Sequence, residues 1–374
     1  MLYIHIPFCK SRCIYCGFFS SSEWSQRQRY VDSICSEIEQ RADYLGKKSL
    51  SSVYLGGGTP SVLSREEFFR IFQAIEQCFS LEPEAEVTVE CNPDDITEEF
   101  LGTLRSLPIN RVSFGVQSFC DSELRFLNRR HNAEQAREAV RRLKAVGIDN
   151  ISIDLMYALH GQTLESWRYS ISEALRLGVQ HISAYCLTYE EDTPLKNMLD
   201  KGYIEAKPDD EAFLYYETLC RELSQAGFIH YEISNFALKG RASAHNSGYW
   251  QGRKYLGIGA SAHSFDAQSR SWNIASIRGY IDGIERGEKP INVEHLTDKD
   301  RFNEAIFLSL RTSSGLDLQR LKREFPTEWI DTMLEVSKKY ANSPDLIELS
   351  PDIIRLTEKG FFLSDGIISD FFIV

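Results

Sequence analysis

The stretch Cys9-Lys-Ser-Arg-Cys13-Ile-Tyr-Cys16 places three cysteines at C-x3-C-x2-C spacing, directly after a short apolar run that ends at Pro7. Cubane iron–sulfur clusters are held by cysteine thiolates, usually four of them. Only three thiols converge in this loop, which leaves one iron free to take a ligand from outside. Such a cluster can pass an electron into a bound molecule. We therefore predict a [4Fe-4S] cluster on Cys9, Cys13 and Cys16.

Zinc is the competing interpretation of the same cysteines. A structural zinc site needs a fourth Cys or His nearby and usually a second paired knuckle. The neighbouring candidate, His5, lies on the preceding predicted strand. We favour the cluster over zinc. The remaining cysteines have no mutual spacing and are expected to be core thiols in a reducing compartment; they are Cys35, Cys78, Cys91, Cys120, Cys186 and Cys220.

Outward from the cysteine loop, strand-sized runs alternate with amphipathic stretches of helix length. This alternation is typical of βα units around a parallel sheet. Ser64 and Thr97 each precede acidic residues that suit a first helical turn, and Gly147 follows a helical pattern. Candidate strands are residues 3–6, 52–55, 86–90, 111–115, 150–155 and 181–187, and helices include residues 26–44, 65–79 and 133–146. Six strands predict an α/β fold, a partial (β/α)6 TIM-like barrel.

The pattern of predicted secondary structure changes twice after the predicted barrel. A charged helix at 209–225 precedes a glycine- and aromatic-rich segment, 228–265, which predicts strands and loops. Near the end, helices precede a hairpin, as in a winged-helix module; the helices are residues 302–309, 318–325 and 328–340, and the hairpin is 346–349 with 353–356. We divide the chain into the barrel (1–190), a connecting region (191–300) and a smaller α+β C-terminal module (301–374). We expect packing or partner contacts from this module rather than DNA binding.

The composition limits the partners. A net charge of −12 and a pI near 5.3 argue against a nucleic-acid partner, because phosphate binding usually requires a basic face. No apolar run reaches the roughly 20 residues that span a bilayer, so membrane contact would be peripheral. The N-terminal sequence has no targeting pattern, and we expect a cytoplasmic protein. A monomer and a homodimer are both left open.

The cysteine loop resembles that of the radical S-adenosylmethionine (SAM) superfamily, whose fold is a full or partial (β/α) barrel. The turn Leu55-Gly-Gly-Gly-Thr59-Pro-Ser61 follows the second predicted strand. Glycines let the backbone approach a ligand closely. In the superfamily this turn binds the SAM amino group. The resemblance implies that SAM binds against the cluster.

Further positions resemble the oxygen-independent coproporphyrinogen III dehydrogenase branch of that superfamily. There, SAM contacts lie at the carboxyl ends of successive barrel strands. Carboxylates, an amide and a guanidinium suit the ribose hydroxyls and the amino-acid end of SAM. Each residue alone would be interpreted as an internal salt bridge or a helix cap, but in barrel order they predict one pocket. The matching SAM residues are Tyr3, Gly57, Gly58, Thr59, Glu90, Gln117, Arg129 and Asp154.

Three features separate the enzyme from HemW-type heme chaperones in this branch. The enzyme has a further Cys two residues after the loop, where this chain has Phe18, and it has an N-terminal extension that is not present before residue 1. The segment His245-Asn246-Ser-Gly-Tyr249-Trp250 resembles the H-N-x-x-Y-W heme motif of the chaperones. An imidazole can ligate heme iron and aromatic rings can stack on the macrocycle. A histidine among aromatics is otherwise usually a satisfied core residue.

The resemblance therefore predicts a heme chaperone that uses a [4Fe-4S] cluster, SAM and heme, and that delivers heme to an acceptor hemoprotein. His245, Asn246, Tyr249 and Trp250 are expected to take part in heme binding, without His245 being assigned as the iron ligand. The alternative is a coproporphyrinogen III dehydrogenase that forms protoporphyrinogen IX. A structural paralogue with an inert cluster is a third interpretation. Whether the protein is an enzyme stays open; the chaperone interpretation predicts no coproporphyrinogen turnover and assigns no catalytic residue.

Overall fold

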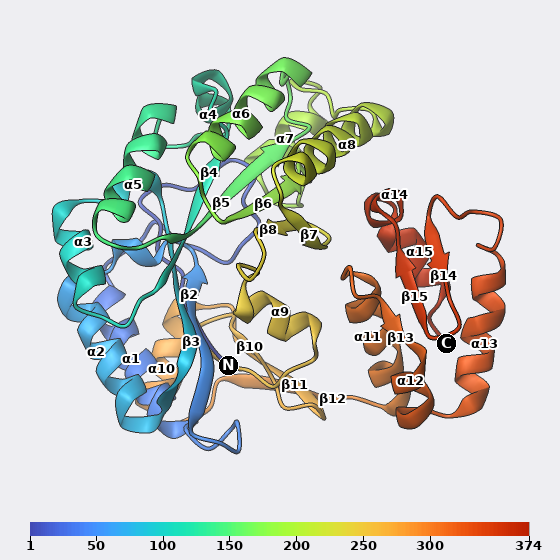
Figure 1. Ribbon diagram of the computed structural model, residues 1–374. Helices are drawn as coiled ribbons and strands as arrows, with labels where there is room; N and C mark the ends of the chain where they lie inside the picture. Colours follow the sequence, from blue (N-terminus) through green and yellow to red (C-terminus); the bar gives the residue numbers. More distant parts are fainter. Residues whose placement is uncertain (374) are drawn as a thin grey trace.

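The computed structural model describes residues 1–373 and is built around one nine-stranded sheet (Figure 1). Its centre consists of parallel strands that follow one another in chain order, which confirms the predicted partial barrel. Both edges of the sheet are extended by later segments, so the barrel does not close through the six central strands. The central strands are β1 (Leu2–Ile6), β2 (Ser49–Gly57), β3 (Ser80–Cys91), β4 (Arg111–Gln117), β5 (Asn150–Tyr157) and β6 (His181–Cys186).

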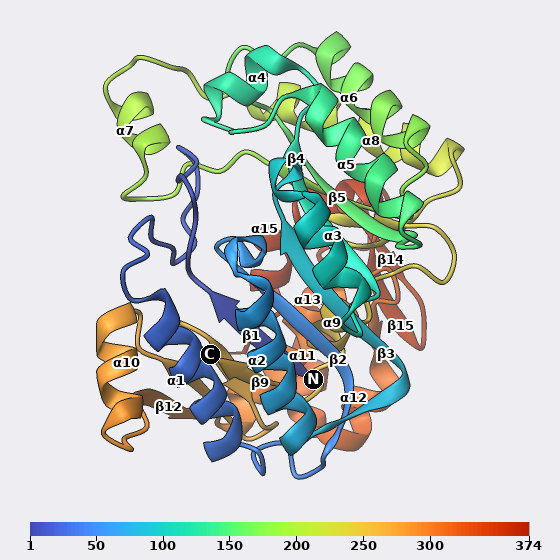
Figure 2. The ribbon, with the colours of Figure 1, turned by 90° about the vertical axis from the view of Figure 1, so that its left-hand side faces the viewer.

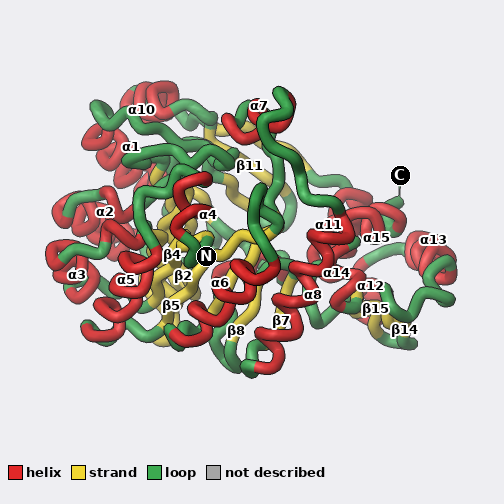
Figure 3. Tube along the Cα trace, turned by 90° about the horizontal axis from the view of Figure 1, so that it is seen from above, coloured by secondary structure: helices red, strands yellow, loops and turns green. Residues whose placement is uncertain are grey.

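Helices cover the outer side of these strands, as the view from above shows (Figure 3). The predicted caps are confirmed: Ser64 accepts from the backbone N–H of Glu67, and Thr97 from that of Phe100. Gly147, with a φ of +85°, follows α5. The helices that accompany the central strands are α1 (Arg27–Gln40), α2 (Arg65–Cys78), α3 (Glu98–Arg105), α4 (Asp121–Phe126), α5 (Ala133–Ala145) and α6 (Leu164–Arg176).

The connecting region contributes strands to both edges of the sheet. Strand β9 (Leu256–Ile258) runs parallel to β1, and β8 (Asn235–Ala237) pairs antiparallel with β6 and with β7 (Ile229–Glu232). A small antiparallel sheet follows, formed by β10 (His263–Phe265), β11 (Ser269–Asn273) and β12 (Ile291–His295). The predicted helix at 209–225 is confirmed as α8 (Asp209–Gln225). Two further helices of this region are α7 (Pro194–Asp200) and α10 (Ile277–Glu285).

One expectation for this region is wrong. The segment predicted as strands and loops contains the helix α9 (Ala244–Trp250), which coincides with the heme-motif residues. Ser243 caps this helix by accepting the N–H of Asn246 at 3.3 Å, and a distant carboxylate adds to it: Glu86 on β3 accepts the backbone N–H of Ala244 at 2.9 Å and that of His245 at 3.0 Å. The hydroxyl of Ser243 also donates to Glu86, at 3.0 Å. A carboxylate at a helix N-terminus satisfies free N–H groups and suits the helix dipole.

The C-terminal module lies beside the barrel (Figure 1) and has the predicted helices and hairpin. Its third strand and its last two helices were not predicted. The elements are α11 (Asp298–Leu310), β13 (Leu316–Asp317), α12 (Leu318–Glu324), α13 (Thr327–Lys338), β14 (Ile347–Leu349), β15 (Ile353–Leu356), α14 (Glu358–Phe362) and α15 (Ser364–Asp370). Across residues 1–373, no helix combines the length and apolar character that crossing a membrane would require.

A buried carboxylate joins the first helix of the barrel to the connecting region. Glu37 on α1 accepts from Arg41 Nη1 at 3.0 Å, from Asn273 Nδ2 at 2.9 Å and from the hydroxyl of Tyr280 at 2.7 Å. The backbone N–H of Gly259 donates to it at 2.9 Å. A buried charge is tolerated only when it is paired and hydrogen-bonded, and Glu37 meets both conditions.

Replacing Glu37 by alanine should destabilise the protein by about 3–5 kcal/mol, because Arg41 would be left as an unpaired buried charge. The urea unfolding midpoint of the full chain measures the effect. Glu39→Ala, on the exposed side of the same helix, is the matched control and should change little. Equal midpoints for the two variants would contradict the structural role given to Glu37.

Candidate functional site

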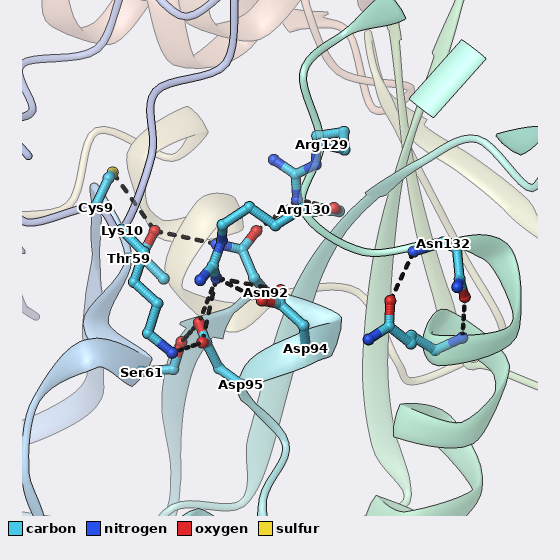
Figure 4. Close-up of polar contacts among 12 residues, drawn as sticks. Cys9, Lys10, Thr59, Ser61, Asn92, Asp94, Asp95, Arg129, Arg130 and Asn132 are labelled. Carbon is cyan, nitrogen blue, oxygen red and sulfur yellow. Dashed lines mark hydrogen bonds and ion pairs between the residues drawn. The ribbon is translucent and has the colours of Figure 1, made fainter. Parts of the chain in front are cut away.

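The cysteine loop extends beyond the end of β1 and reaches toward α7 (Figure 2). Its backbone is held at both ends, since Cys9 N–H donates to the carbonyl of Ser21 at 2.9 Å and the Ile14 carbonyl accepts from Leu195 N–H at 2.9 Å. Between the first two cysteines, Lys10 forms an ion pair of 2.5 Å with Asp95, whose side chain is only 1% exposed (Figure 4). The loop is therefore tied to the sheet rather than free.

Asp95 holds its position through two further donors. The hydroxyl of Ser61 donates to it at 2.9 Å, and Arg130 Nη2 donates at 3.2 Å. Asp95 lies just beyond β3, and Ser61 lies just beyond the glycine turn that follows β2. The anchor of the cysteine loop thus comes from the carboxyl ends of two neighbouring strands.

Two of the three sulfur atoms accept hydrogen bonds from a connected set of side chains; Figure 4 shows Cys9 with Thr59 and Asn92. The hydroxyl of Thr59 donates to Cys9 Sγ at 3.5 Å, and Arg129 Nη1 donates to Cys13 Sγ at 3.1 Å. Asn92 links the two donors, because its amide nitrogen donates to Thr59 at 3.3 Å and its amide oxygen accepts from Arg129. Sequence reasoning missed Asn92, although its position two residues after Glu90, beyond a strand end, was an available signal.

The spacing of the three sulfur atoms tests which metal group they fit. Within residues 1–373, the only three Cys, His or acidic side chains whose ligand atoms all lie within 4.8 Å of one another are Cys220, His230 and Glu358. At least one pair of the cysteine-loop sulfurs is therefore more than 4.8 Å apart. Around one tetrahedral zinc ion, sulfurs lie about 3.8 Å apart. The wider spacing fits a cluster with its irons at separate corners.

The electrostatics of the loop agree with a metal-bound state. Burial raises the pKa of Cys9 and of Cys16, and the charges of neighbouring thiolates raise both further. Three thiolates therefore do not gather here without compensating positive charge. Metal ligation supplies that charge and removes the protons. The thiol chemistry, the spacing and the sulfur-directed donors all fit an iron–sulfur cluster.

The glycine turn packs too closely for side chains. Gly57 has a φ of +105°, and a Cβ placed there would meet His5 at 2.4 Å; one placed on Gly58 would meet the carbonyl of Ile6 at 2.8 Å. Glu90 accepts the N–H of Gly57 at 3.1 Å and the hydroxyl of Tyr54 at 2.7 Å. The turn and Glu90 are thus fixed to one another. Tyr54 was not among the predicted site residues.

Gln117 and Arg129 lie at the same end of the sheet as the glycine turn, whereas Tyr3 lies near the start of β1. A Cβ on Gly115 would meet the side-chain nitrogens of Gln117 at 2.9 Å and Arg129 at 3.1 Å, so these two groups share one small space. The strand is irregular there, because Gln117 has a φ of +70°. Tyr3, on β1, contacts His5 through its hydroxyl at 3.0 Å. Gln117 and Arg129 are therefore close together, and Tyr3 approaches the glycine turn through His5, while the assignment of these residues to one SAM pocket stays a prediction.

Among these residues, Asp154 has a strongly raised pKa. Burial, then the charge of Glu90, raises its pKa from 3.8 to about 7, although Ser183, Arg111 and Arg129 act in the opposite direction. Strongly perturbed carboxyls gather at functional sites. Glu90 and Asp154 are half-buried, and the amino and hydroxyl groups of a ligand would offset the desolvation of these carboxyls.

The raised pKa of Asp154 predicts a pH-dependent loss of stability in the ligand-free protein. In the unfolded chain this carboxyl ionises near 3.8, whereas in the fold it keeps its proton to about 7. Stability should therefore fall as the pH rises through this window and stay low above it. Asp154→Asn lacks this loss, so its melting temperature should exceed that of the parent by more at about pH 8 than at about pH 5.

Asp149→Asn is the control, because Asp149 is exposed just before the same strand. Its difference from the parent should not depend on pH. A melting-temperature difference between Asp154→Asn and the parent that stays constant from about pH 5 to about pH 8 would contradict this prediction. It would show that Asp154 is ionised in the fold and that other groups offset its desolvation.

The heme-motif residues lie at one side of the sheet, where α9 packs on β2. His245 is 1% exposed and uses both ring nitrogens, with the hydroxyl of Ser52 at 2.8 Å from Nδ1 and the hydroxyl of Tyr249 at 2.9 Å from Nε2. Burial lowers its pKa to about 3, so it is neutral. Asn246, Tyr249 and Trp250 are half-buried, and Tyr249 lines a cavity. Tyr249 therefore lines the cavity, and the His245 imidazole that it contacts does not.

Comparison with known proteins agrees with this geometry. Residues 3–174 match the Radical SAM superfamily, and residues 296–363 match the HemN C-terminal domain. In the solved structure of coproporphyrinogen III oxidase (HemN) from Escherichia coli, the match covers 99% of this chain and 89% of that chain, with a TM-score of 0.86 and 23% identity. That likeness shows the fold. Barrel, cysteine loop and glycine turn are those of a radical SAM protein.

Full-length relatives narrow the class further. The heme chaperone HemW of Lactococcus lactis is 35% identical over 99% of this chain and 96% of its own length. The heme chaperone HemW of Bacillus subtilis is 34% identical over 99% of this chain and 98% of its own length. The mitochondrial radical S-adenosyl methionine domain-containing protein 1 of Danio rerio is 35% identical over 98% and 85%. This chain belongs to the HemW family of radical SAM proteins, a family whose cofactors include a [4Fe-4S] cluster and SAM.

Proposed function

We propose that this protein is a heme chaperone that binds heme and passes it to an acceptor hemoprotein in the cytoplasm. The observation that carries the proposal is similarity to proteins named heme chaperones over nearly their whole length, C-terminal module included. The E. coli coproporphyrinogen oxidase shares the fold at lower identity. Phe18, at the position where that branch of enzymes has a further Cys, supports the same choice.

In this proposal the cysteine loop holds the cluster and the carboxyl ends of the strands hold SAM. When bound, the cluster supplies an electron to SAM. Thr59 and Arg129 donate hydrogen bonds to sulfur, which stabilises the added negative charge of a reduced cluster. The glycine turn lets the backbone approach the ligand closely, and Glu90 and Asp154 would accept from its amino and hydroxyl groups.

The proposed partners follow from the same assignment. Heme is the cargo, and a hemoprotein is the acceptor. The C-terminal module (301–374) packs beside the barrel, and we assign it a role in contact with the acceptor rather than with DNA, since the chain carries a net charge of −12. The barrel (1–190) would hold the cluster and SAM, and the connecting region (191–300) the heme segment.

The anaerobically reconstituted full chain should take up ferric heme with a defined Soret band and release it to an apo-hemoprotein. Given SAM, a reductant and coproporphyrinogen III, it should form no protoporphyrinogen IX. Tyr249→Ala should weaken heme uptake, because Tyr249 presents the motif to the cavity. Tyr203→Ala, which removes a tyrosine that is 72% exposed elsewhere, should behave as the parent.

Formation of protoporphyrinogen IX would favour the dehydrogenase instead. A chain that neither binds heme nor turns over porphyrinogen would be the inert paralogue. Heme uptake without passage to any acceptor would contradict the delivery step while leaving binding in place.

A further inference from the structure

A cavity of about 500 Å³ lies between the cysteine loop, α9, the β10–β11 hairpin and α11. Its volume falls within the range of cofactor pockets, roughly 300–1,000 Å³. The wall is largely aromatic, with rings from Phe18, Phe19, Tyr249, Tyr255 and Phe265. Aromatic rings offer flat apolar faces on which a planar macrocycle can stack.

Two residues that distinguish the chaperone from the dehydrogenase by sequence meet at this cavity. Phe18 replaces the enzyme's further cysteine, and Tyr249 belongs to the heme motif; both line the wall. Phe18 is 71% exposed although it is a large apolar side chain. An apolar ligand in the cavity would cover this surface. Their convergence supports one shared ligand rather than two unrelated substitutions.

Only one histidine in the cavity wall has free ring nitrogens. His5 Nε2 donates to the carbonyl of Phe19 at 2.9 Å, and its Nδ1 accepts the hydroxyl of Tyr3 at 3.0 Å. Among residues 1–373, no side chain or backbone group hydrogen-bonds the ring of His263. That ring stacks on Trp272, with centroids 5.9 Å apart and planes at 21°, and β10 holds it at the wall. Although its side chain is exposed, partial desolvation and the charge of Arg270 lower the pKa of His263, which favours the neutral form that binds iron.

The other potential iron ligands are occupied. The Tyr249 hydroxyl pairs with His245, and the Tyr255 hydroxyl accepts from Arg270 Nη1 at 3.3 Å. Arg270 also lies over the ring of Phe265 and donates through Nε to Glu304 at 2.7 Å. A guanidinium has five N–H groups, so Arg270 can still donate to a carboxylate such as a heme propionate. The cavity thus offers stacking surfaces, one free imidazole and one cation.

We propose that heme lies in this aromatic cavity and that His263, rather than His245 of the motif, provides the axial nitrogen to the iron. The inference rests on the proposed heme-binding function and deepens it. His245 is then a positioning residue that holds Tyr249 against the cavity, so the motif matters for affinity while the iron ligand comes from β10.

The test is a heme titration of the full chain, with the Soret band, the dissociation constant and the iron–histidine stretch of the ferrous form in resonance Raman as readouts. His263→Ala should lose the iron–histidine stretch and bind heme about tenfold or more weakly. Added imidazole should restore the axial signature. Its melting temperature should stay near that of the parent, because the side chain is exposed. His245→Ala should bind more weakly but keep the iron–histidine stretch.

Two further variants locate the heme and control for histidine loss. Phe18→Ala should weaken binding without changing the axial signature. His295→Ala, an exposed histidine on β12 that is not part of the cavity wall, should match the parent. Loss of the stretch in His245→Ala with its retention in His263→Ala would overturn the ligand assignment, and unchanged affinity in Phe18→Ala would overturn the cavity placement. Absence of heme binding by the parent would instead reject the proposed function.

Discussion

Three thiolates on one short loop repel one another, and the site exists because the barrel holds the sulfur atoms apart and supplies donors to them. The ion pair between Lys10 and Asp95 fixes the loop to the strand ends. Thr59 and Arg129 then donate to Cys9 and Cys13. Three parallel strands, β2, β3 and β4, end close to these groups, so the fold is a precondition of the site.

Two carboxyls on the central strands lower the stability of the fold locally. Glu90 and Asp154 are half-buried, and desolvation raises the pKa of each, whereas an ordinary core would use apolar residues there. Proteins accept such local destabilisation at positions that bind or react. The large apolar core of the barrel, together with ties such as Glu37 to the connecting region, gives the fold the stability to tolerate it.

Much of this could be predicted because the information is local. Alternation of strands and helices, helix caps and the cysteine spacing each depend on a few consecutive residues. The helix α9 was missed although Ser243 is a local cap; the carboxylate that also holds its N-terminus, Glu86, lies far away in the sequence. Asn92 and Tyr54 were visible as polar residues near strand ends. The role of His263 depends on which histidine nitrogens are free, and no sequence pattern records that.

The central claim is that the cysteine loop holds a [4Fe-4S] cluster with one iron open to SAM. Electron paramagnetic resonance of the reduced, anaerobically reconstituted full chain, recorded before and after SAM is added, tests it most directly. We predict the signal of a reduced cubane whose g-values shift with SAM, and no such signal when Cys9, Cys13 and Cys16 are all replaced by serine. A spectrum that SAM leaves unchanged, or one that survives the triple replacement, would contradict the account.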